Sequence, residues 1–534
     1  MQGKGQGRTS LALALLPFIR GFLARLKRQR RAEAVIDRAY PAWARRDNPN
    51  PEYWRGEIAA LKFTPIISIV MPVCDPDADW LREAILSVRG QFYDKWELLI
   101  ADDYCRSPEV VARLSKQVGD PRVDVVRMRS RVGISAATNA ALSRATGLFV
   151  TFLDHDDVLA PHALAAVARA IAETPDLDMV FSDEDQLVNG KRARPYFKPG
   201  WNPDLLLSQN VVCHLAAYRR ALVTRLGGLR SAYDGSQDHD LALRAVADTN
   251  PRKVRHLPMV LYHWRQSATA MSAVAEDACR DAARRAIADH LSARGRVAPN
   301  PTLPQWPVVR FDLPGPAPRI SIITEVPTEE LGALYYDPTK LEHVPTAREA
   351  TGDVLIFVAR TLRPRTPDWL GELAAQASRP EIGAAGARLT GPDGTVVHAG
   401  FVLDPVKVAQ SPAPHADAND PGYRGHFRLP RTVAAISGDC YAVRRTVYEA
   451  AGGFDASAGD FADVDFCLRL AARGLRTVWT AHAWLQYTAN PRAKRSGAVW
   501  MRGRWAAVLR ADPYGNPNLR LSNGQLRLVR RKKK

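Results

Sequence analysis

The sequence predicts an α/β protein with a Rossmann-like, mostly parallel sheet, followed by a second, truncated copy of the same fold. Two observations lead to this prediction. From Pro65 onward, apolar strand patterns alternate with amphipathic helix patterns, which is typical of βαβ units and a parallel sheet. Beyond a Pro-rich stretch, three of the motifs return in their original order, which indicates an internal duplication.

The first copy contains a series of predicted strands separated by helices. The run ISIVMP is the first strand, an amphipathic helix over 80–91 follows, and the second strand, WELLIADD, ends on Asp102 and Asp103. Further elements lead to the apolar run GLFVTFL, which ends on an acidic motif that starts at Asp154. Because the carboxyl ends of parallel strands share one edge of a sheet, we expect both acidic groups at that edge.

The second copy is shorter than the first. RISIIT, ATGDVLIFV and DVDFCLRLAARG repeat the motifs ISIVMP, ATGLFVTFL and DHDLALRAVAD. The first two motifs lie about 80 residues apart in the first copy but only about 30 apart in the second. The second copy is therefore expected to lack most of the βαβ segment that would hold a nucleotide.

With 534 residues, the chain exceeds the size at which a single core keeps growing, so two domains are expected. The expected parts are a basic, amphipathic N-terminal helical region (1–60), a first α/β domain (61–298), a Pro-rich linker (299–318), a degenerate second domain (319–520) and a basic tail (521–534).

The chain is strongly basic, with 74 Lys and Arg residues against 56 Asp and Glu residues. A surplus of this sign favours phosphate-bearing or anionic partners. Nucleic acid is not expected, because neither a recognition helix nor an aromatic RNA-binding motif accompanies the charge. The six cysteines form no CxxC pair, which fits a reduced, cytoplasmic protein.

The apolar segment 11–26 contains Arg20 and Arg25 and is too short to span a bilayer. Two alternatives stay open for it. One is an interfacial helix that makes a peripheral contact with anionic lipid on the inner face of the cytoplasmic membrane. The other is a helix packed on the protein's own core.

Asp154 and Asp156, together with Asp157, place hard oxygen ligands at the end of a buried strand. Mg²⁺ and Mn²⁺ prefer such carboxylates together with phosphate oxygens, so the motif indicates a divalent-cation site. The alternative is a strand-end turn in which Asp157 caps the next helix.

Asp102 and Asp103 end another strand and are suited to accept hydrogen bonds from a nucleobase or from ribose hydroxyls. An Asx-turn that closes the strand is the competing interpretation.

Asp238 and Asp240 open a predicted helix. The helix dipole keeps a carboxylate ionised there, and a charged Asp can serve as a general base. The alternative is plain helix capping, for which Asp240 is a good candidate. His263, at the end of a further apolar strand, is either a metal ligand or a buried core histidine.

Eight motifs occur together in the first copy: ISIVMPV, WELLIADD, RVGISAATNAAL, FVTFLDHDDVLAPHAL, FSDEDQL, YFKPGWNPDLLLSQN, GSQDHDLALR and LYHWR. In this combination they resemble a family 2 glycosyltransferase of the GT-A fold, across residues 65–272. The tandem arrangement, together with DPYGNPNL (512–519), is similar to bacterial rhamnosyltransferase-like proteins that assemble O-antigen and other cell-surface polysaccharides.

The resemblance implies a role for each matched residue. Asp238 takes the place of the catalytic base, and Asp154 and Asp156 form the metal-binding motif, with Asp156 as the direct ligand. His263 takes the place of a metal- or pyrophosphate-contacting histidine. Asp103 is implied to contact the base of the nucleotide. Contacts to the nucleotide-sugar donor are implied for Pro72, Asp75, Asp102, Asp103, Arg131, Asn139 and Asp154.

The chain departs from the family at several positions. The first loop reads PVCD (72–75) where the family has Pro-Val-Tyr-Asn, and Gln237 leaves one candidate base in the acidic pair. In the second copy, Ala359-Arg360-Thr361 replaces the metal ligands and Tyr487-Thr488 replaces the histidine, while Asp463 keeps the base position. We expect this second domain to bind no donor, with Asp463 as a helix cap, and to serve acceptor binding, packing or partner contacts.

The resemblance implies an inverting, metal-dependent glycosyltransferase of the hexosyl or rhamnosyl type. It would move a sugar from a nucleoside diphosphate sugar to a hydroxyl group of a growing cell-surface glycan, on a glycan or lipid-linked glycan acceptor. The alternative is a non-catalytic glycan-binding or scaffold protein of a polysaccharide assembly system. A nucleotidyltransferase would share the sheet and the acidic site, but GSQDHDL and LYHWR fit glycosyl transfer better.

Overall fold

The computed structural model describes residues 31–117, 119–266, 275–332, 334–412, 416–491, 496–522 and 524–529. The segment 11–26, expected to contact either membrane or core, and residues 530–534 of the basic tail lie outside these ranges. Among the helices within them, none is both long enough and apolar enough to cross a membrane.

The chain divides into two compact units. The N-terminal unit comprises Ala39–Asp312 together with Pro513–Leu519 and, among the described residues that follow, 528 and 529. The C-terminal unit comprises Leu313–Asp512 together with Arg520–Arg527 and, among the described residues near the N-terminus, 31–38.

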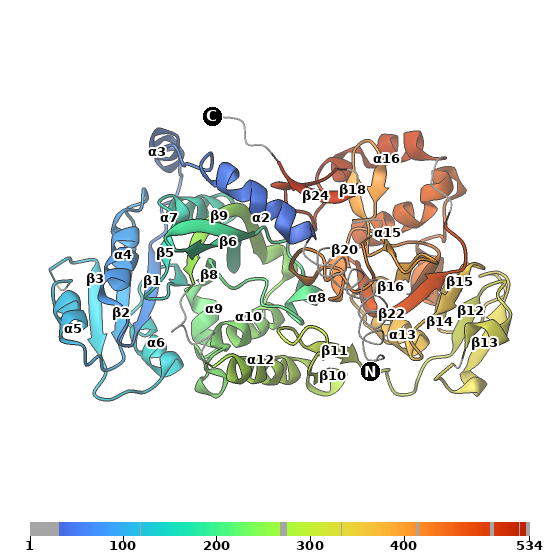
Figure 1. Ribbon diagram of the computed structural model, residues 1–534, viewed down its shortest axis with the longest axis horizontal. Coiled ribbons are helices and arrows are strands. Elements are labelled where there is room, and N and C mark those ends of the chain that lie inside the picture. The colour runs from blue at the N-terminus through green and yellow to red at the C-terminus, as the bar shows by residue number, and fades with distance from the viewer. Residues whose placement is uncertain are drawn as a thin grey trace, which may run out of the picture. The chain divides into compact units, whose positions relative to one another are not determined.

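A mixed sheet forms the centre of the N-terminal unit, with the strand order β3-β2-β1-β4-β8-β6-β9-β5 and with β7 paired to β6 (Figure 1). The neighbours among β1 to β4 run parallel, as do β6 and β9, whereas β8 is antiparallel to both β4 and β6. This arrangement confirms the predicted α/β fold class. The strands are β1 (Ile67–Val73), β2 (Trp96–Asp102), β3 (Val123–Arg127), β4 (Phe149–Phe152), β5 (Val158–Leu159), β6 (Met179–Val188), β7 (Lys191–Tyr196), β8 (Ala216–Arg219) and β9 (Val254–Arg265).

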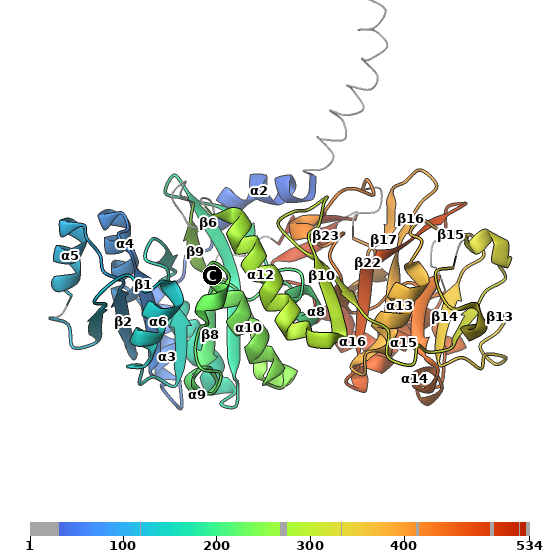
Figure 2. The ribbon, with the colours of Figure 1, turned by 90° about the horizontal axis from the view of Figure 1, so that it is seen from below.

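Helices cover both faces of the parallel part of this sheet. The helices α4 (Ala78–Arg89) and α5 (Pro108–Ser115) lie on one face, and α6 (Ile134–Leu142) packs on the other, as right-handed crossovers require (Figure 2). Asp77 starts α4 by accepting two backbone N–H groups, and Gly90 follows its last residue. The other longer helices of the unit are α3 (Pro51–Ala59), α7 (Ala163–Glu173), α10 (Gln237–Ala247) and α12 (Glu276–Leu291).

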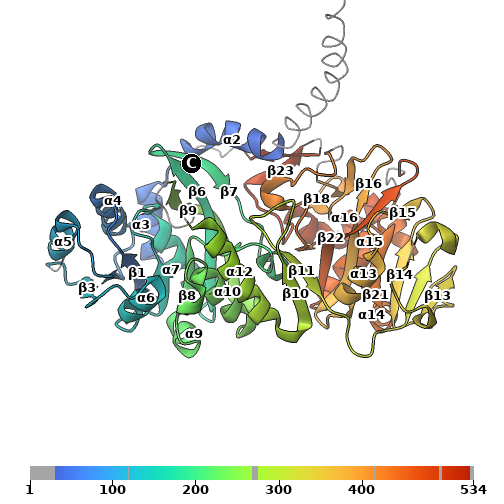
Figure 3. The same cartoon turned by 60° about the horizontal axis from the view of Figure 1, so that its bottom comes forward.

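The C-terminal unit repeats this strand order. Its main sheet runs β13-β12-β14-β21-β16-β22-β15, which matches β2-β1-β4-β8-β6-β9-β5 strand by strand and in the direction of every pair (Figure 3). The strands are β12 (Ile320–Ile323), β13 (Leu341–Val344), β14 (Val354–Val358), β15 (Leu362–Pro364), β16 (Ile382–Thr390), β21 (Cys440–Arg444) and β22 (Arg476–Tyr487). The helices α13 (Trp369–Ser378), α14 (Arg445–Ala450) and α15 (Ala462–Ala472) accompany them.

The second copy is truncated in its first part. Between β12 and β14, the residues that the structure describes form β13 and two short 3-10 turns, where the N-terminal unit has α4, α5, β3 and α6. The predicted second domain of the same fold, with its nucleotide-type half shortened, is thereby confirmed.

A buried polar cluster is common to both sheets. Ser68 donates to Glu97 (2.6 Å) and accepts the N–H of Gly147 (3.0 Å). The counterparts in the C-terminal unit, with the same contacts at 2.5 and 2.8 Å, are Ser321, Glu342 and Gly352. A Cβ on Gly147 would lie 2.6 Å from the Ser68 hydroxyl, and a Cβ on Gly352 would meet the main chain at 2.7 Å. The cluster therefore requires glycine in both copies.

We expect Gly147→Ala and Gly352→Ala to lower the free energy of unfolding by a similar amount, ~1–3 kcal/mol each, because the added methyl group overpacks the cluster. Gly56→Ala is the control: a Cβ there meets no atom within 4 Å, and the residue lies in the exposed part of α3. It should be neutral or stabilise by up to ~1 kcal/mol. Urea unfolding followed by circular dichroism measures all three, and a wild-type stability for Gly352→Ala would contradict the shared geometry.

Candidate functional site

Two carboxylates and one imidazole meet at the sheet edge where β4 ends. Asp154 and Asp157 follow β4, and His214 comes shortly before β8, the strand that pairs with β4. One ligand atom from each residue lies within 4.8 Å of the other two. Carboxylate oxygens suit Mg²⁺ or Mn²⁺, and an imidazole nitrogen is a ligand that Mn²⁺ accepts, so these residues fit the divalent cation expected from the sequence.

Asp157 is the fully buried member of this group. Tyr262 donates its hydroxyl hydrogen to Asp157 Oδ2 (2.6 Å), and the Arg265 amide donates to Oδ1 (2.6 Å). Burial, followed by the nearby charges of Asp154 and Asp156, nevertheless raises the pKa of Asp157 well above its usual range. A bound cation would offset this repulsion. The strand β5, rather than a helix, follows Asp157, so the helix-capping alternative is not what this residue does.

Asp154 links the group electrostatically to the candidate base. Burial raises the pKa of Asp154, His214 opposes the rise, and the charges of Asp156 and Asp238 add to it. The charge of Asp238 therefore acts on Asp154 at the end of β4. Asp156 accepts a hydrogen bond from Arg265 at its main-chain carbonyl (2.7 Å). The assignment of its carboxylate as the direct metal ligand stays a prediction.

His263 is held by a buried carboxylate that the sequence did not single out. Its Nδ1 lies 2.5 Å from Asp185, which also accepts hydrogen bonds from Tyr40 (2.5 Å) and Arg192 (2.6 Å). Burial acts to raise the pKa of Asp185, but His263 and Arg192 hold it below its usual value. A carboxylate at Nδ1 orients the imidazole ring, as is usual for a ligating histidine. Its metal or pyrophosphate contact stays a prediction.

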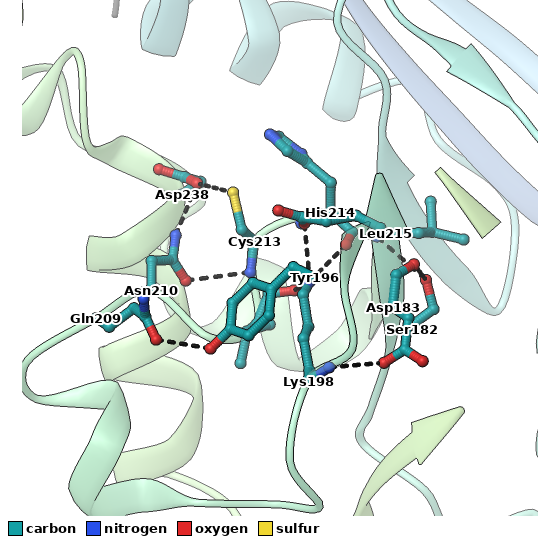
Figure 4. A network of polar contacts seen from close by, with 12 residues as sticks. Ser182, Asp183, Tyr196, Lys198, Gln209, Asn210, Cys213, His214, Leu215 and Asp238 are labelled. Atoms are coloured by element: carbon teal, nitrogen blue, oxygen red, sulfur yellow. Dashed lines mark hydrogen bonds and ion pairs between the residues drawn. The ribbon is translucent and has the colours of Figure 1, made fainter. Parts of the chain in front are cut away.

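Asp238 lies in the first turn of α10 and receives two hydrogen bonds from one loop. Asn210 donates its side-chain N–H to Asp238 Oδ2 (2.8 Å), and the Cys213 sulfur lies 3.4 Å from the same oxygen (Figure 4). Burial, with the Asp238 charge as the next cause, raises the pKa of Cys213 well above its usual value. The thiol therefore keeps its proton and donates it to the carboxylate. These contacts fix the orientation of the candidate base.

Asp240, the other acid of this helix, has a structural role. It is buried and forms ion pairs with Arg230 and Arg244, the latter at 2.7 Å. Burial acts to raise the pKa of Asp240, but hydrogen bonds and ion pairs with Arg230 and Arg244 hold the pKa below its usual value. Asp238 is thus the acid of the pair that faces the site.

A buried lysine anchors the loop 209–215. Lys198 Nζ lies 2.9 Å from the Glu184 carboxylate and donates to the carbonyl groups of Val212 (3.2 Å) and His214 (2.5 Å) (Figure 4). The three N–H bonds of the ammonium group each have a partner, which compensates its burial. Sequence reasoning missed Lys198 and His214. The available signal was a lysine inside the otherwise apolar motif YFKPGW.

The residues implied to contact the donor surround the ends of β1 and β2. Asp75 forms an ion pair with Arg131, and Asp103 accepts the N–H groups of Val132 (2.7 Å) and Gly133 (3.1 Å). Burial acts to raise the pKa of Asp75, but hydrogen bonds from two backbone amides and from Arg131 hold it below its usual value. Both carboxylates therefore fix the loop that precedes α6.

The remaining donor candidates also hold the local backbone. Asp102 accepts the N–H of Cys105 (2.7 Å), so the Asx-type turn named as its competing interpretation is present. Asn139 donates to and accepts from the main chain of Leu229 (2.8 and 2.9 Å), and Pro72 lies in β1. Direct donor contacts by these residues stay a prediction.

The C-terminal unit has other side chains at the equivalent positions. The register of β14 with β21 matches that of β4 with β8, which aligns Asp439 with His214. The pairs of β6 with β9 and of β16 with β22 place Gln486 at the position of His263, and Tyr487 is the next residue. Tyr487 donates its hydroxyl hydrogen to Asp439, so a Tyr–Asp hydrogen bond is formed where the N-terminal unit has His214. Asp463 accepts a backbone N–H from the loop before β21 (2.8 Å).

Comparison with known proteins adds a family likeness. The model of the family described as Glycosyl transferase family 2 matches residues 68–227. The chain is 34% identical to the putative colanic acid biosynthesis glycosyl transferase WcaA of Escherichia coli, over 38% of this chain and 74% of that protein.

Two longer relatives align with most of this chain. The identity is 33% to the uncharacterized protein y4gI of Sinorhizobium fredii, over 87% of this chain, and 33% to the O-antigen biosynthesis protein RfbC of Myxococcus xanthus, over 90% of this chain. The aligned parts make up 58% and 42% of these relatives, so the chain spans about half of their length.

The free energy of unfolding is expected to depend on pH through His239, which is the next residue after Asp238 on α10. Its ring is buried with Nε2 2.8 Å from the Leu206 carbonyl, and burial lowers its pKa. The stability that the neutral ring contributes is present above the unfolded pKa of about 6.5. It is lost as the pH falls toward the folded pKa, by at most ~1.4 kcal/mol per pH unit.

His239→Gln keeps a donor for the Leu206 carbonyl but cannot titrate. Urea unfolding between pH 7.5 and pH 5 should therefore give a smaller loss of stability for this variant than for the wild type. Equal losses in both proteins would show that His239 makes no such contribution.

Proposed function

Because the chain belongs to glycosyl transferase family 2, we propose that it is an inverting glycosyltransferase that acts on a growing cell-surface glycan. The donor is a nucleoside diphosphate sugar, and the acceptor is a hydroxyl group of a glycan or a lipid-linked glycan. The observation that carries the proposal is that Asp154, Asp157 and His214 lie together at one sheet edge, while the loop that contains His214 also holds Asp238 through Asn210 and Cys213.

Asp238 serves as the general base in this proposal. Its carboxylate takes the proton of the acceptor hydroxyl while the acceptor oxygen forms a bond to the anomeric carbon. The bond from that carbon to the diphosphate oxygen breaks on the opposite face, so the configuration inverts. Asn210 and Cys213 orient the carboxylate, and a positioned base of this kind contributes ~10²–10⁴-fold in rate.

Asp154, Asp157 and His214 would hold the divalent cation, with Asp156 and His263 as the further candidates from the sequence. When bound, the cation supplies Lewis-acid stabilisation of the charge that develops on the departing diphosphate. The chain's own residues bring the base and this charge-stabilising group to the same edge of the sheet, where Asp103 and Arg131 would contact the nucleotide.

The biological setting follows from the names of the relatives. RfbC is named for O-antigen biosynthesis and WcaA for colanic acid biosynthesis, which supports a role in the assembly of a cell-surface polysaccharide. Rhamnosyl or hexosyl transfer is the corresponding proposal for the sugar. A peripheral contact of residues 11–26 with anionic lipid would place the cytoplasmic enzyme near a lipid-linked acceptor.

Asp238→Asn is expected to fold and to lose transfer by ~10²–10⁴-fold, because the amide cannot accept the acceptor proton. Asp463→Asn is the matched control: it makes the same change at the equivalent position of the second copy and should leave turnover unchanged. Transfer of radiolabelled sugar from UDP-, dTDP- and GDP-sugars measures both. Full turnover by Asp238→Asn would refute the base assignment.

Binding measurements on the wild-type protein distinguish the proposed enzyme from a non-catalytic scaffold protein. Calorimetric binding of a nucleotide-sugar that depends on Mn²⁺, and that EDTA abolishes, is expected of the enzyme. A wild-type protein that binds glycan but no donor would instead support the non-catalytic alternative.

The two histidines are expected to respond differently to substitution. His214→Gln should raise the Mn²⁺ concentration for half-maximal turnover by roughly tenfold or more, because it removes a nitrogen from the group around Asp154. His263→Gln should raise the KM for the donor with a smaller effect on Mn²⁺, as expected of a pyrophosphate contact. Titration of Mn²⁺ and of donor in steady-state assays measures both. A larger Mn²⁺ effect in His263→Gln would favour Asp154, Asp156 and His263 as the metal set.

A further inference from the structure

Residues near the end of the chain complete the N-terminal unit. The segment Pro513–Leu519 belongs to this unit, and the side chains of Asn516 and Asn518 are buried in it. Sequence reasoning grouped these residues with the second domain. Asn516 Nδ2 lies 3.0 and 2.9 Å from the two carboxylate oxygens of Asp183, and Asn518 Nδ2 lies 2.9 Å from the Pro258 carbonyl.

Asp183 depends on donors such as these. Its side chain is fully buried in β6, and it also accepts the N–H of Lys198 (2.9 Å) and lies 2.8 Å from His256 Nε2. Asn518 Nδ2 adds a longer contact at 3.4 Å. A buried carboxylate that loses a hydrogen-bond donor keeps the full cost of its desolvation, so the hydrogen bonds from the asparagines compensate the burial of Asp183.

The contacts of Asn516 converge on the main chain of Lys198. The Lys198 N–H donates to Asp183, and the Lys198 carbonyl accepts the Asn516 side-chain N–H (2.8 Å). Both backbone polar groups of the lysine are thus fixed by the Asp183–Asn516 pair. From this fixed backbone, Nζ reaches the carbonyl groups of Val212 and His214 (Figure 4).

The backbone of the segment is tightly apposed to the residues that follow Lys198. A Cβ on Gly200 would lie 1.9 Å from the Pro513 carbonyl oxygen. Only glycine permits this approach, so the segment and the 198–200 backbone have to move together.

We infer that Asn516 and Asn518 are positioning residues for glycosyl transfer. They fix Lys198, which holds the loop 209–215, and this loop carries the groups that orient Asp238 and the imidazole beside Asp154. The end of the chain is thereby part of the catalytic unit. The inference rests on the proposed function only for the chemical role of Asp238, and the coupling of the segment to the loop is independent of it.

The test uses full-length protein with Asn516→Asp, which keeps the shape but cannot donate and sets two carboxylates against each other. Gly200→Ala displaces the same segment from the opposite side. The matched control is Asn250→Asp, at an exposed residue whose side-chain oxygen accepts the Arg252 N–H, a role that Asp retains. If Asn516→Asp does not fold, Asn518→Ala replaces it.

The first measurement needs no donor. Mass spectrometry follows the alkylation of each cysteine by iodoacetamide, with the exposed Cys74 and the buried Cys440 as internal references. We expect the alkylation rate of Cys213 to rise by about tenfold or more in Asn516→Asp and Gly200→Ala, because the loop loosens. Cys74 and Cys440 should react as in the wild type, and Asn250→Asp should match the wild type throughout.

The second measurement is steady-state transfer per folded protein. We expect kcat to fall by about tenfold or more, with the donor KM changed less than threefold, because the donor contacts lie elsewhere. A lower unfolding midpoint with unchanged Cys213 reactivity and unchanged kcat would overturn the inference, since the contact would then serve packing alone. A wild type that transfers no sugar while Cys213 still responds would refute the proposed function and leave the coupling supported.

Discussion

Repulsion among the carboxylates at the end of β4 is the constraint from which the arrangement of the N-terminal site follows. Asp154 and Asp157 are held close together, and burial, with the charges of neighbouring carboxylates, raises the pKa of each. A fold keeps such a cluster only if it supplies donors or positive charge, because uncompensated buried charges are costly. Tyr262 and the Arg265 amide supply donors to one carboxylate, and His214 stands beside both. A divalent cation and a diphosphate would complete the balance.

The second copy has the same fold but lacks the cluster of carboxylates that repel one another. Its strand order and pair directions are those of the first copy, and the Ser–Glu–Gly cluster is kept, because that cluster serves the sheet itself. The acids are replaced by Ala359-Arg360-Thr361, and Asp439, which accepts a hydrogen bond from Tyr487, takes the position of His214. The packing requirements of the fold and the charge requirements of the site are therefore separable, and only the second set has been lost.

The fold and the acidic residues after β4 could be predicted from the sequence, because both leave a signal in a short continuous stretch of residues. Alternating strand and helix patterns indicated the sheets, and Asp154 was found because an apolar strand stops on it. Lys198 and His214 could not be found in this way. Their partners lie in loops and strands that meet only in the folded chain, and a lysine with three acceptors shows no periodicity. Asp185 was missed for the same reason, since its partners Tyr40, Arg192 and His263 are scattered along the sequence.

The segment Pro513–Leu519 follows the second copy in sequence but belongs to the first unit. The second copy therefore connects the first unit to a segment that the first unit needs. Asp183 is fully buried on β6 and accepts hydrogen bonds from the side chain of Asn516. Asn516 follows the whole second copy in sequence. If these contacts position Lys198, the second copy is free to lose a metal site but not to lose the segment that follows it. Selection on Asn516 would then act through catalysis in the first unit. A buried carboxylate of the first unit therefore depends on donors that the chain reaches only after the second copy.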